Sequence, residues 1–378
     1  MGPPMWKLDT SKRPGEALRE ALEAKGWTQE ELAMIAGRSR GTIAEIISGR
    51  TGITPEMAVS LGAAFENEAS EWLNLDAKFR LAQVVGDSAE IQKRMSLFTI
   101  APVRDMQKRG WIQETIDVRE LEEELKKFFS VSSLDRPPDI PVATRRNTKA
   151  QDLTPQQRAW CFRAREMATA LVVRRFNLSR LQEASKEIRS LAAYRKEAQY
   201  LPQLLADYGI RFVVVEPLPG AKIDGAAFWL DEGSPVIATS VRYDRIDAFW
   251  FTAMHEFAHI QNGDAVSVDN QLLVDAPKDR AGRDDAEQRA DAEASSSLVP
   301  KAELESFIRR IGPLYSKTRI IQFAHRIKIH PGIIVGQLQH YGEISFRTHR
   351  EMLVRIRDVI TAVALTDGWG HSITPSLL

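Results

Sequence analysis

The chain has 378 residues, 43% of them hydrophobic, and its 51 Lys/Arg balance 51 Asp/Glu. This length accommodates two or three domains, each with its own hydrophobic core. The only cysteine, Cys161, excludes a disulfide framework and cysteine-rich zinc sites, and we expect it to be a small buried residue. Because we find neither a signal peptide nor an apolar run of membrane-spanning length, we expect a cytoplasmic protein with no membrane partner.

The N-terminal region, from Gly15 to Phe65, reads as four short helical segments in succession. Thr28 and Glu31 predict a capping box at the start of the second segment, because each can satisfy the other's backbone N–H. Ser39 can cap the third segment, Arg40 to Ser48, whose isoleucines face inward. A helix, a tight turn and a second helix form the geometry that places the second helix in the major groove of DNA.

This region resembles the lambda-repressor-like helix-turn-helix domains and, within them, the HigA antitoxin branch. The resemblance covers roughly residues 14–85 and rests on the runs RSRGTIAEIISGR (38–50), ITPEMA (53–58) and EWLNL (71–75). It implies one set of residues facing the groove and another meeting phosphates. The groove set is Arg40, Gly41, Thr42 and Glu45, and the phosphate set is Gln29, Arg38 and Arg50.

Arg40 can pair bidentately with a guanine edge. One such unit reads few base pairs, so the expected partners are an inverted-repeat operator and a second copy of the chain. The domain as a whole is not basic, and contact with another protein is the alternative use of this fold.

The region from 86 to 155 reads as a helical connector followed by a Pro-rich linker, Ser132 to Pro155. Charge is unevenly distributed beyond it. Residues 145–196 hold thirteen Lys/Arg against four Asp/Glu, whereas residues 224–306 hold seven against seventeen. The basic stretch can contact DNA phosphates or pack against the acidic half of the same molecule, and we expect the second.

Three short strands are predicted at Ile210–Glu216, Gly225–Asp231 and Pro235–Ser240, followed by a helix over Tyr243–Gln261. This helix contains the motif H-E-x-x-H. His255 and His259 share one face and can bind one zinc ion, with Glu256 beside them as a base rather than a ligand. Two histidines and one carboxylate leave a coordination position open, as in catalytic zinc sites.

The third ligand must come from elsewhere, because Asn262 and Ala265 stand where the extended motif H-E-x-x-H-x-x-G-x-x-H needs Gly and His. A carboxylate-rich run, Asp284–Glu293, follows downstream.

Here the sequence resembles the ImmA/IrrE metallopeptidase family, in which a helix E-x-x-A-N-x-F-A-A-x-L-L-x-P follows H-E-x-x-H. The matching residues run from Glu287 to Pro300. The resemblance implies that Glu287 is the third zinc ligand. Asp291 replaces the family's Asn and Glu293 replaces an aromatic. Both add negative charge near the metal, so Asp291 can support a ligand or compete as one, and a solvated acidic face is the alternative reading.

The predicted fold is mainly α with a smaller β part. It comprises an all-α helix-turn-helix domain (14–85), the connector and linker (86–155), an α+β zincin-like domain with a small sheet (156–345) and a helical tail (346–378). The predicted function is an antitoxin-like repressor carrying a Zn²⁺-dependent endopeptidase that relieves repression by cleaving itself, within the linker, or another regulator. The alternative is a non-catalytic antitoxin whose zinc fold binds a toxin or senses a ligand.

Overall fold

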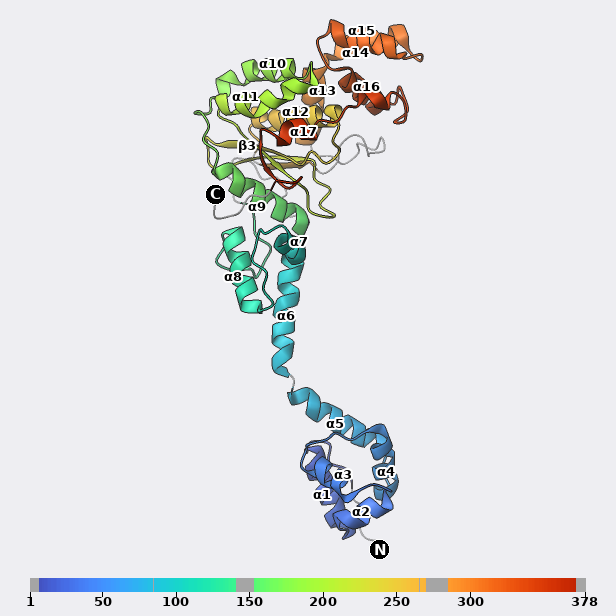
Figure 1. Ribbon diagram of the computed structural model, residues 1–378. Coiled ribbons are helices and arrows are strands. Elements are labelled where there is room, and N and C mark those ends of the chain that lie inside the picture. The colour runs from blue at the N-terminus through green and yellow to red at the C-terminus, as the bar shows by residue number, and fades with distance from the viewer. Residues whose placement is uncertain (1–6, 84, 141–152, 265, 270–284, 372–378) are drawn as a thin grey trace. The chain divides into compact units, whose positions relative to one another are not determined.

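The computed structural model describes residues 7–83, 85–140, 153–264, 266–269 and 285–371 (Figure 1). Its contacts divide the chain into two compact units, Met1–Met95 and Ser96–Leu378. The described chain is mostly helical with one small mixed sheet, which confirms the predicted fold class. Among these residues, no helix combines the length and the apolar character needed to cross a membrane.

The first unit is all helical. It contains α1 (Pro14–Lys25), α2 (Gln29–Ile35), α3 (Arg40–Ile47), α4 (Pro55–Phe65), α5 (Ala69–Gln83) and most of α6 (Val85–Ile100). The predicted capping box is confirmed, because Thr28 N donates to Glu31 Oε2 (2.7 Å) and Glu31 N donates to Thr28 Oγ1 (3.2 Å). Ser39 Oγ accepts from Thr42 N (3.1 Å) at the start of α3, as predicted. Trp72 lies fully buried in the core that α1–α5 share.

The second unit combines helices and the sheet. Its helices are α7 (Val103–Lys108), α8 (Val118–Phe129), α9 (Pro155–Thr169), α10 (Leu181–Leu191), α11 (Leu201–Asp207), α12 (Ile246–Asn262), α13 (Asp285–Leu298), α14 (Lys301–Ile311), α15 (Lys317–Arg326), α16 (Pro331–His340) and α17 (Arg357–Thr361). Short 3₁₀ segments are η2 (Leu178–Arg180), η3 (Arg195–Tyr200) and η4 (Arg350–Met352). Arg189 of α10 donates to the carbonyls of Leu298 and Ile327, so this part of the basic stretch packs inside the unit.

The sheet has the strand order β4-β2-β3-β1-β5. Its strands are β1 (Arg211–Val215), β2 (Gly225–Trp229), β3 (Pro235–Thr239), β4 (Val266–Asp269) and β5 (Leu365–Asp367). β1 is parallel to β3 and β5, whereas β2 is antiparallel to β3 and β4. The three predicted strands are confirmed. β5 lies in the tail that the sequence predicts to be helical, because Leu365–Asp367 pairs with β1.

Both faces of this sheet are covered. Phe212 and Val214 face a core made with α10–α17, while Val213 and Val215 face a second core made with α7, α8 and α9. Alternate residues of a strand point to opposite faces, so burial on both sides explains the continuous apolar runs of β1 and β3. α12 packs on one face and α9 on the other.

The connector belongs to the second unit from Ser96 onward, although the sequence predicts a separate segment over 86–155. α7 and α8 bury their apolar sides in the core that faces α9. Within the predicted linker, Leu134 and Ile140 are also buried in that core. Residues 141–152 of the linker lie outside the described residues. The described linker is therefore anchored to the unit at Leu134, Pro138 and Ile140, while most of the residues around them are exposed.

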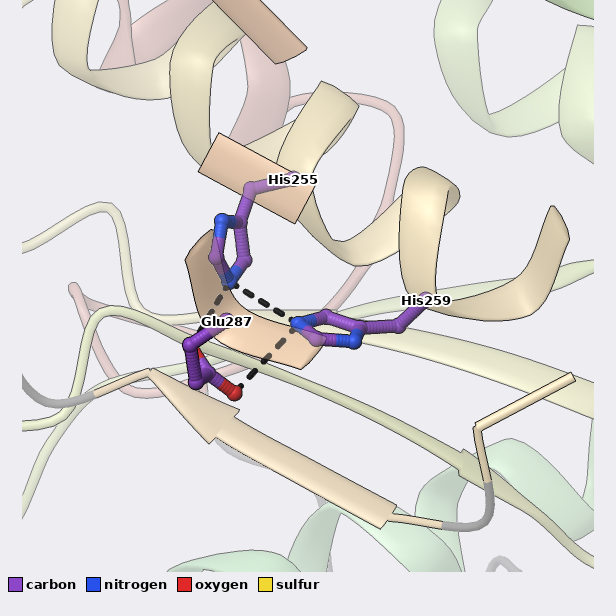
Figure 2. A group of neighbouring side chains, drawn as sticks. All are labelled: His255, His259 and Glu287. Atoms are coloured by element: carbon purple, nitrogen blue, oxygen red, sulfur yellow. Dashed lines mark hydrogen bonds and ion pairs between the residues drawn. The ribbon is translucent and has the colours of Figure 1, made fainter. Parts of the chain in front are cut away.

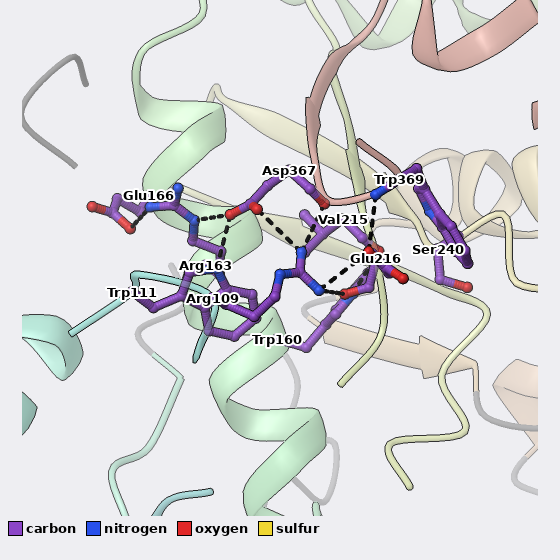
Figure 3. Close-up of polar contacts among 10 residues, drawn as sticks. All are labelled: Arg109, Trp111, Trp160, Arg163, Glu166, Val215, Glu216, Ser240, Asp367 and Trp369. Atoms are coloured by element: carbon purple, nitrogen blue, oxygen red, sulfur yellow. Dashed lines mark hydrogen bonds and ion pairs between the residues drawn. The ribbon is translucent and has the colours of Figure 1, made fainter. Parts of the chain in front are cut away.

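A buried polar cluster joins the connector to the sheet (Figure 3). Asp367 of β5 is its centre, since its carboxylate accepts from Arg163 Nε (2.5 Å), Trp111 Nε1 (2.8 Å) and Arg109 Nη2 (3.1 Å). Arg163 has no exposed surface and also contacts Glu166. Because a buried charge is tolerated only when it is paired, these contacts fix α7, α9 and β5 against one another.

Candidate functional site

The H-E-x-x-H motif lies in the C-terminal half of α12. His255, Glu256 and His259 are each at most 1% exposed. The helix ends at Gly263, whose left-handed backbone (φ 69°) turns the chain. Asp264 N then donates to the carbonyl of His259 (3.0 Å). This turn returns the Asp264 side chain to the face that carries the histidines.

Three side chains converge beside α12 (Figure 2). His255 Nε2 lies 3.0 Å from His259 Nε2 and 3.3 Å from Glu287 Oε2, and His259 Nε2 lies 3.4 Å from Glu287 Oε1. Ligand atoms about 2.0–2.1 Å from a tetrahedral zinc ion stand about 3.3 Å apart, so the spacing and the donor set both fit zinc. The described residues form one such metal-type cluster, and it consists of these three side chains.

A carboxylate lies behind each imidazole. His259 Nδ1 lies 2.8 Å from Asp264 Oδ2, and His255 Nδ1 lies 3.1 Å from Asp291 Oδ1. A carboxylate on Nδ1 fixes the ring orientation and leaves Nε2 available as a ligand, an arrangement typical of metal-binding histidines. Asp291 therefore lies behind His255 and outside the three-residue cluster.

α13 brings Glu287 to the site because it packs along α12. Its small residues Ala290 and Ala294 are fully buried, which lets the two helices approach closely. Glu293 accepts from Asn262 Nδ2 (3.1 Å) at the end of α12. This carboxylate therefore joins the two helices, and it takes no part in the three-residue cluster.

Glu256 has no exposed surface and lies between α12 and the sheet. Its side chain packs against Gly225 at the start of β2. Burial raises the pKa of the neighbouring Cys161 thiol, and the Glu256 charge raises it further. Cys161 is thus a neutral buried residue, as predicted, whereas Glu256 is the carboxylate next to the cluster that does not belong to it.

The predicted DNA-reading residues lie on α3 and beside it. Arg40, Gly41 and Glu45 are exposed and Thr42 is half-buried. Of the phosphate set, Arg38 and Arg50 are exposed and Gln29, the first residue of α2, is half-buried. Ile43 and Ile46 anchor α3 in the core, so the opposite side of α3 is presented to solvent.

Asp264 was not predicted from the sequence. It follows α12 directly, and a carboxylate five residues after the second histidine is the only signal that could have indicated it. Gly225 was not predicted either, because the close approach of a helix to a strand leaves no motif.

Comparisons with known proteins find a family model and two similar proteins, and the family model lies within the first unit. A helix-turn-helix family model matches residues 18–72. Virulence-associated protein A′ of Dichelobacter nodosus is 35% identical over 79 residues, which are 21% of this chain and 69% of that protein. The uncharacterized HTH-type transcriptional regulator YddM of Escherichia coli (strain K12) is 29% identical over 77 residues, which are 20% of this chain and 82% of that protein.

Proposed function

The chain belongs to the helix-turn-helix family through its N-terminal unit and is a DNA-binding regulator. We propose that it is a cytoplasmic, antitoxin-like repressor with a zinc-dependent endopeptidase in its second unit. The observation that carries the second half is the convergence of His255, His259 and Glu287 at zinc-ligand spacing. Carboxylates behind both histidines support it. The ImmA/IrrE resemblance agrees with the same three ligands.

His255, His259 and Glu287 would hold the metal. When bound, zinc supplies a Lewis acid that polarises a carbonyl and activates water. Glu256 accepts a proton from the attacking water on its carboxylate while the new C–O bond forms, and it delivers that proton to the amine nitrogen as the C–N bond breaks. Burial of Glu256 excludes bulk water from this transfer.

The sheet supports a peptide as substrate. β4 stands at the end of the strand order and packs against α12, the helix with the two histidines. An extended peptide can add to such an edge through main-chain hydrogen bonds. The site would then bind unfolded or loop segments of a protein rather than a small molecule.

The DNA-binding half would act as a homodimer on an inverted repeat, with one α3 in each half-site. Arg40 would read a guanine and the phosphate set would fix the register. Such binding should weaken steeply as salt rises, because phosphate contacts release counterions.

The cleaved protein would be this chain or another regulator. A cut between Ser132 and Pro155 would leave α7 and α8 attached to the sheet by their shared core and by Asp367. Self-cleavage there would not by itself release the DNA-binding unit. This packing favours a second regulator as substrate. Family analogy suggests that this regulator is a repressor with the same type of helix-turn-helix.

The experiment is to purify the wild-type chain with zinc and to incubate it alone and with a tagged Glu256→Gln chain as substrate. Discrete fragments that need zinc and are absent when all copies carry Glu256→Gln would support the proposal. Intact protein under inducing conditions, while repression is still relieved, would exclude self-cleavage and leave either a separate protein substrate or the non-catalytic antitoxin. Asp291 lies beside His255 and Glu293 accepts from Asn262, so both carboxylates have partners other than the metal, which favours the catalytic proposal over that alternative.

A further inference from the structure

Gly225 lies where no side chain fits. It is the first residue of β2 and faces α12. A Cβ atom at this position would stand 2.6 Å from Glu256 Oε1, 2.7 Å from Thr252 Cγ2 and 3.0 Å from Glu256 Cγ. A glycine inside a strand often marks such a close approach.

The strand cannot retreat to make room. Gly225 is paired on both sides, with Thr239 of β3 and Asp269 of β4. The preceding residue is also fixed, because Asp224 O accepts from Ser240 N (2.9 Å) and the Asp224 carboxylate accepts two bonds from Arg242 (2.9 and 2.8 Å). A side chain at 225 must therefore move the helix or the side chains above it.

The helix is held as firmly as the strand. α12 is buried from Ile246 to Ile260 and packs against α13 and α16 as well as β2. Shifting it would disturb both histidines. The Glu256 side chain, which rotates about single bonds, is the group that would yield first.

We propose that Gly225 is a positioning residue for Glu256: its missing side chain sets where the Glu256 carboxylate lies beside the metal ligands. The proposal rests on the role of Glu256 as base under the proposed function. A base displaced by about 1 Å can lower turnover about 100-fold. Gly225→Ala should therefore lower kcat about 10- to 100-fold with zinc content and KM nearly unchanged.

The contact itself is tested without any activity, through Tm. Gly225→Ala should lower Tm by roughly 2–10 °C, as expected for overpacking. Combined with Glu256→Gln, which keeps the shape of the side chain, the loss should persist. Combined with Glu256→Ala, which removes the clashing atoms, most of it should disappear. Gly233→Ala is the matched control, because a Cβ there meets only Asp231 Oδ1 at 3.8 Å.

Thr252→Ser tests the competing explanation. If Gly225 only lets the helix and strand pack closely, removing Thr252 Cγ2 should restore Tm while Glu256→Ala does not, and this result would overturn the proposal. Should Gly225→Ala fail to fold, recovery of folding in Gly225→Ala/Glu256→Ala but not in Gly225→Ala/Thr252→Ser would support the proposal, and the reverse would overturn it. Failure of the wild-type chain to cleave the tagged Glu256→Gln chain and a second repressor with this type of helix-turn-helix would count against the proposed function alone, since the Tm comparison does not depend on cleavage.

Discussion

The Nδ1 atom of His255 lies 3.1 Å from Oδ1 of Asp291, on the opposite edge of the ring from Nε2. One turn along the helix, His259 Nδ1 is hydrogen-bonded to Asp264 Oδ2 at 2.8 Å. The two carboxylates come from different elements, α13 and the turn after α12. A carboxylate from a different element therefore lies behind each imidazole, which leads to a prediction about metal affinity.

Asp291→Asn should weaken zinc binding about 10- to 100-fold without abolishing it, because an amide orients the His255 ring less strongly than a carboxylate. His259→Ala should reduce zinc from about one ion per chain to none, since it removes a ligand. Zinc content and affinity are measured by elemental analysis and by competition with a chelator. Loss of all zinc in Asp291→Asn together with retention in Glu287→Ala would identify Asp291 as the third ligand.

Arg40→Ala should lower affinity for the operator by about 1–3 kcal/mol and affect random DNA much less, because Arg40 is expected to read a base edge. Arg50→Ala is the matched control, since a phosphate contact contributes to both DNAs equally. Binding curves on operator and random DNA at one salt concentration measure the difference. Equal losses for Arg40→Ala on both DNAs would make it a phosphate contact.

His330 predicts a pH dependence of stability. Its Nδ1 accepts from Gly332 N (3.0 Å), so His330 caps the start of α16. Burial lowers the pKa of His330, and the Asp247 charge opposes this in part. Between the lowered folded pKa and the unfolded value of about 6.5, the unfolded chain binds more protons, so stability rises with pH.

The His330 contribution should therefore be complete above pH 6.5 and be lost as pH falls toward the folded pKa. His330→Asn keeps an acceptor for the cap but does not titrate. The difference in free energy of unfolding between wild type and His330→Asn, measured from pH 8 to 5, should fall on the acid side. A difference that stays flat over this range would exclude the titration of His330 as a cause.

Asp367→Ala should destabilise the second unit by about 3–5 kcal/mol, because it leaves Arg163 buried without this counter-charge. Asp358→Ala provides the control. Asp358 pairs with Arg195 at the surface, where its side chain is 67% exposed, so its loss should change stability by no more than about 1 kcal/mol. Urea unfolding followed by tryptophan fluorescence measures both. Similar losses of unfolding free energy in the two variants would contradict the role of Asp367 in fixing α7, α9 and β5 against one another.

Local patterns predicted most of the elements that carry the site. Caps such as Thr28 and Ser39 involve residues three apart, and the pair His255 and His259 shares one helix, so sequence spacing is enough to define them. The predicted strands likewise follow from runs of apolar residues. The third ligand, Glu287, was named through a family resemblance rather than through spacing.

The missed features depend on contacts between distant segments. β5 has three residues and is a strand only because it pairs with β1. The affiliation of the connector with the sheet depends on a core shared between α7, α8 and α9, which periodicity within any one helix cannot reveal. The role of Gly225 depends on its contact with Glu256 of α12, which lies 31 residues later in the sequence but adjacent in space. No residue type near Gly225 indicates that contact.

The contacts of Asp367 also determine the order in which the parts of this protein can fold during synthesis on the ribosome. Arg109 and Asp367 are separated by 258 residues, and Arg163 and Asp367 by 204. At a synthesis rate of about 5–20 residues per second, roughly 10–50 s pass between the synthesis of Arg109 and that of its partner Asp367. The residues of the helix-turn-helix core are all synthesised before this interval begins, because that core uses residues only up to Leu75. The helix-turn-helix unit of a nascent chain can therefore fold while β5 has not yet been synthesised and the sheet is incomplete.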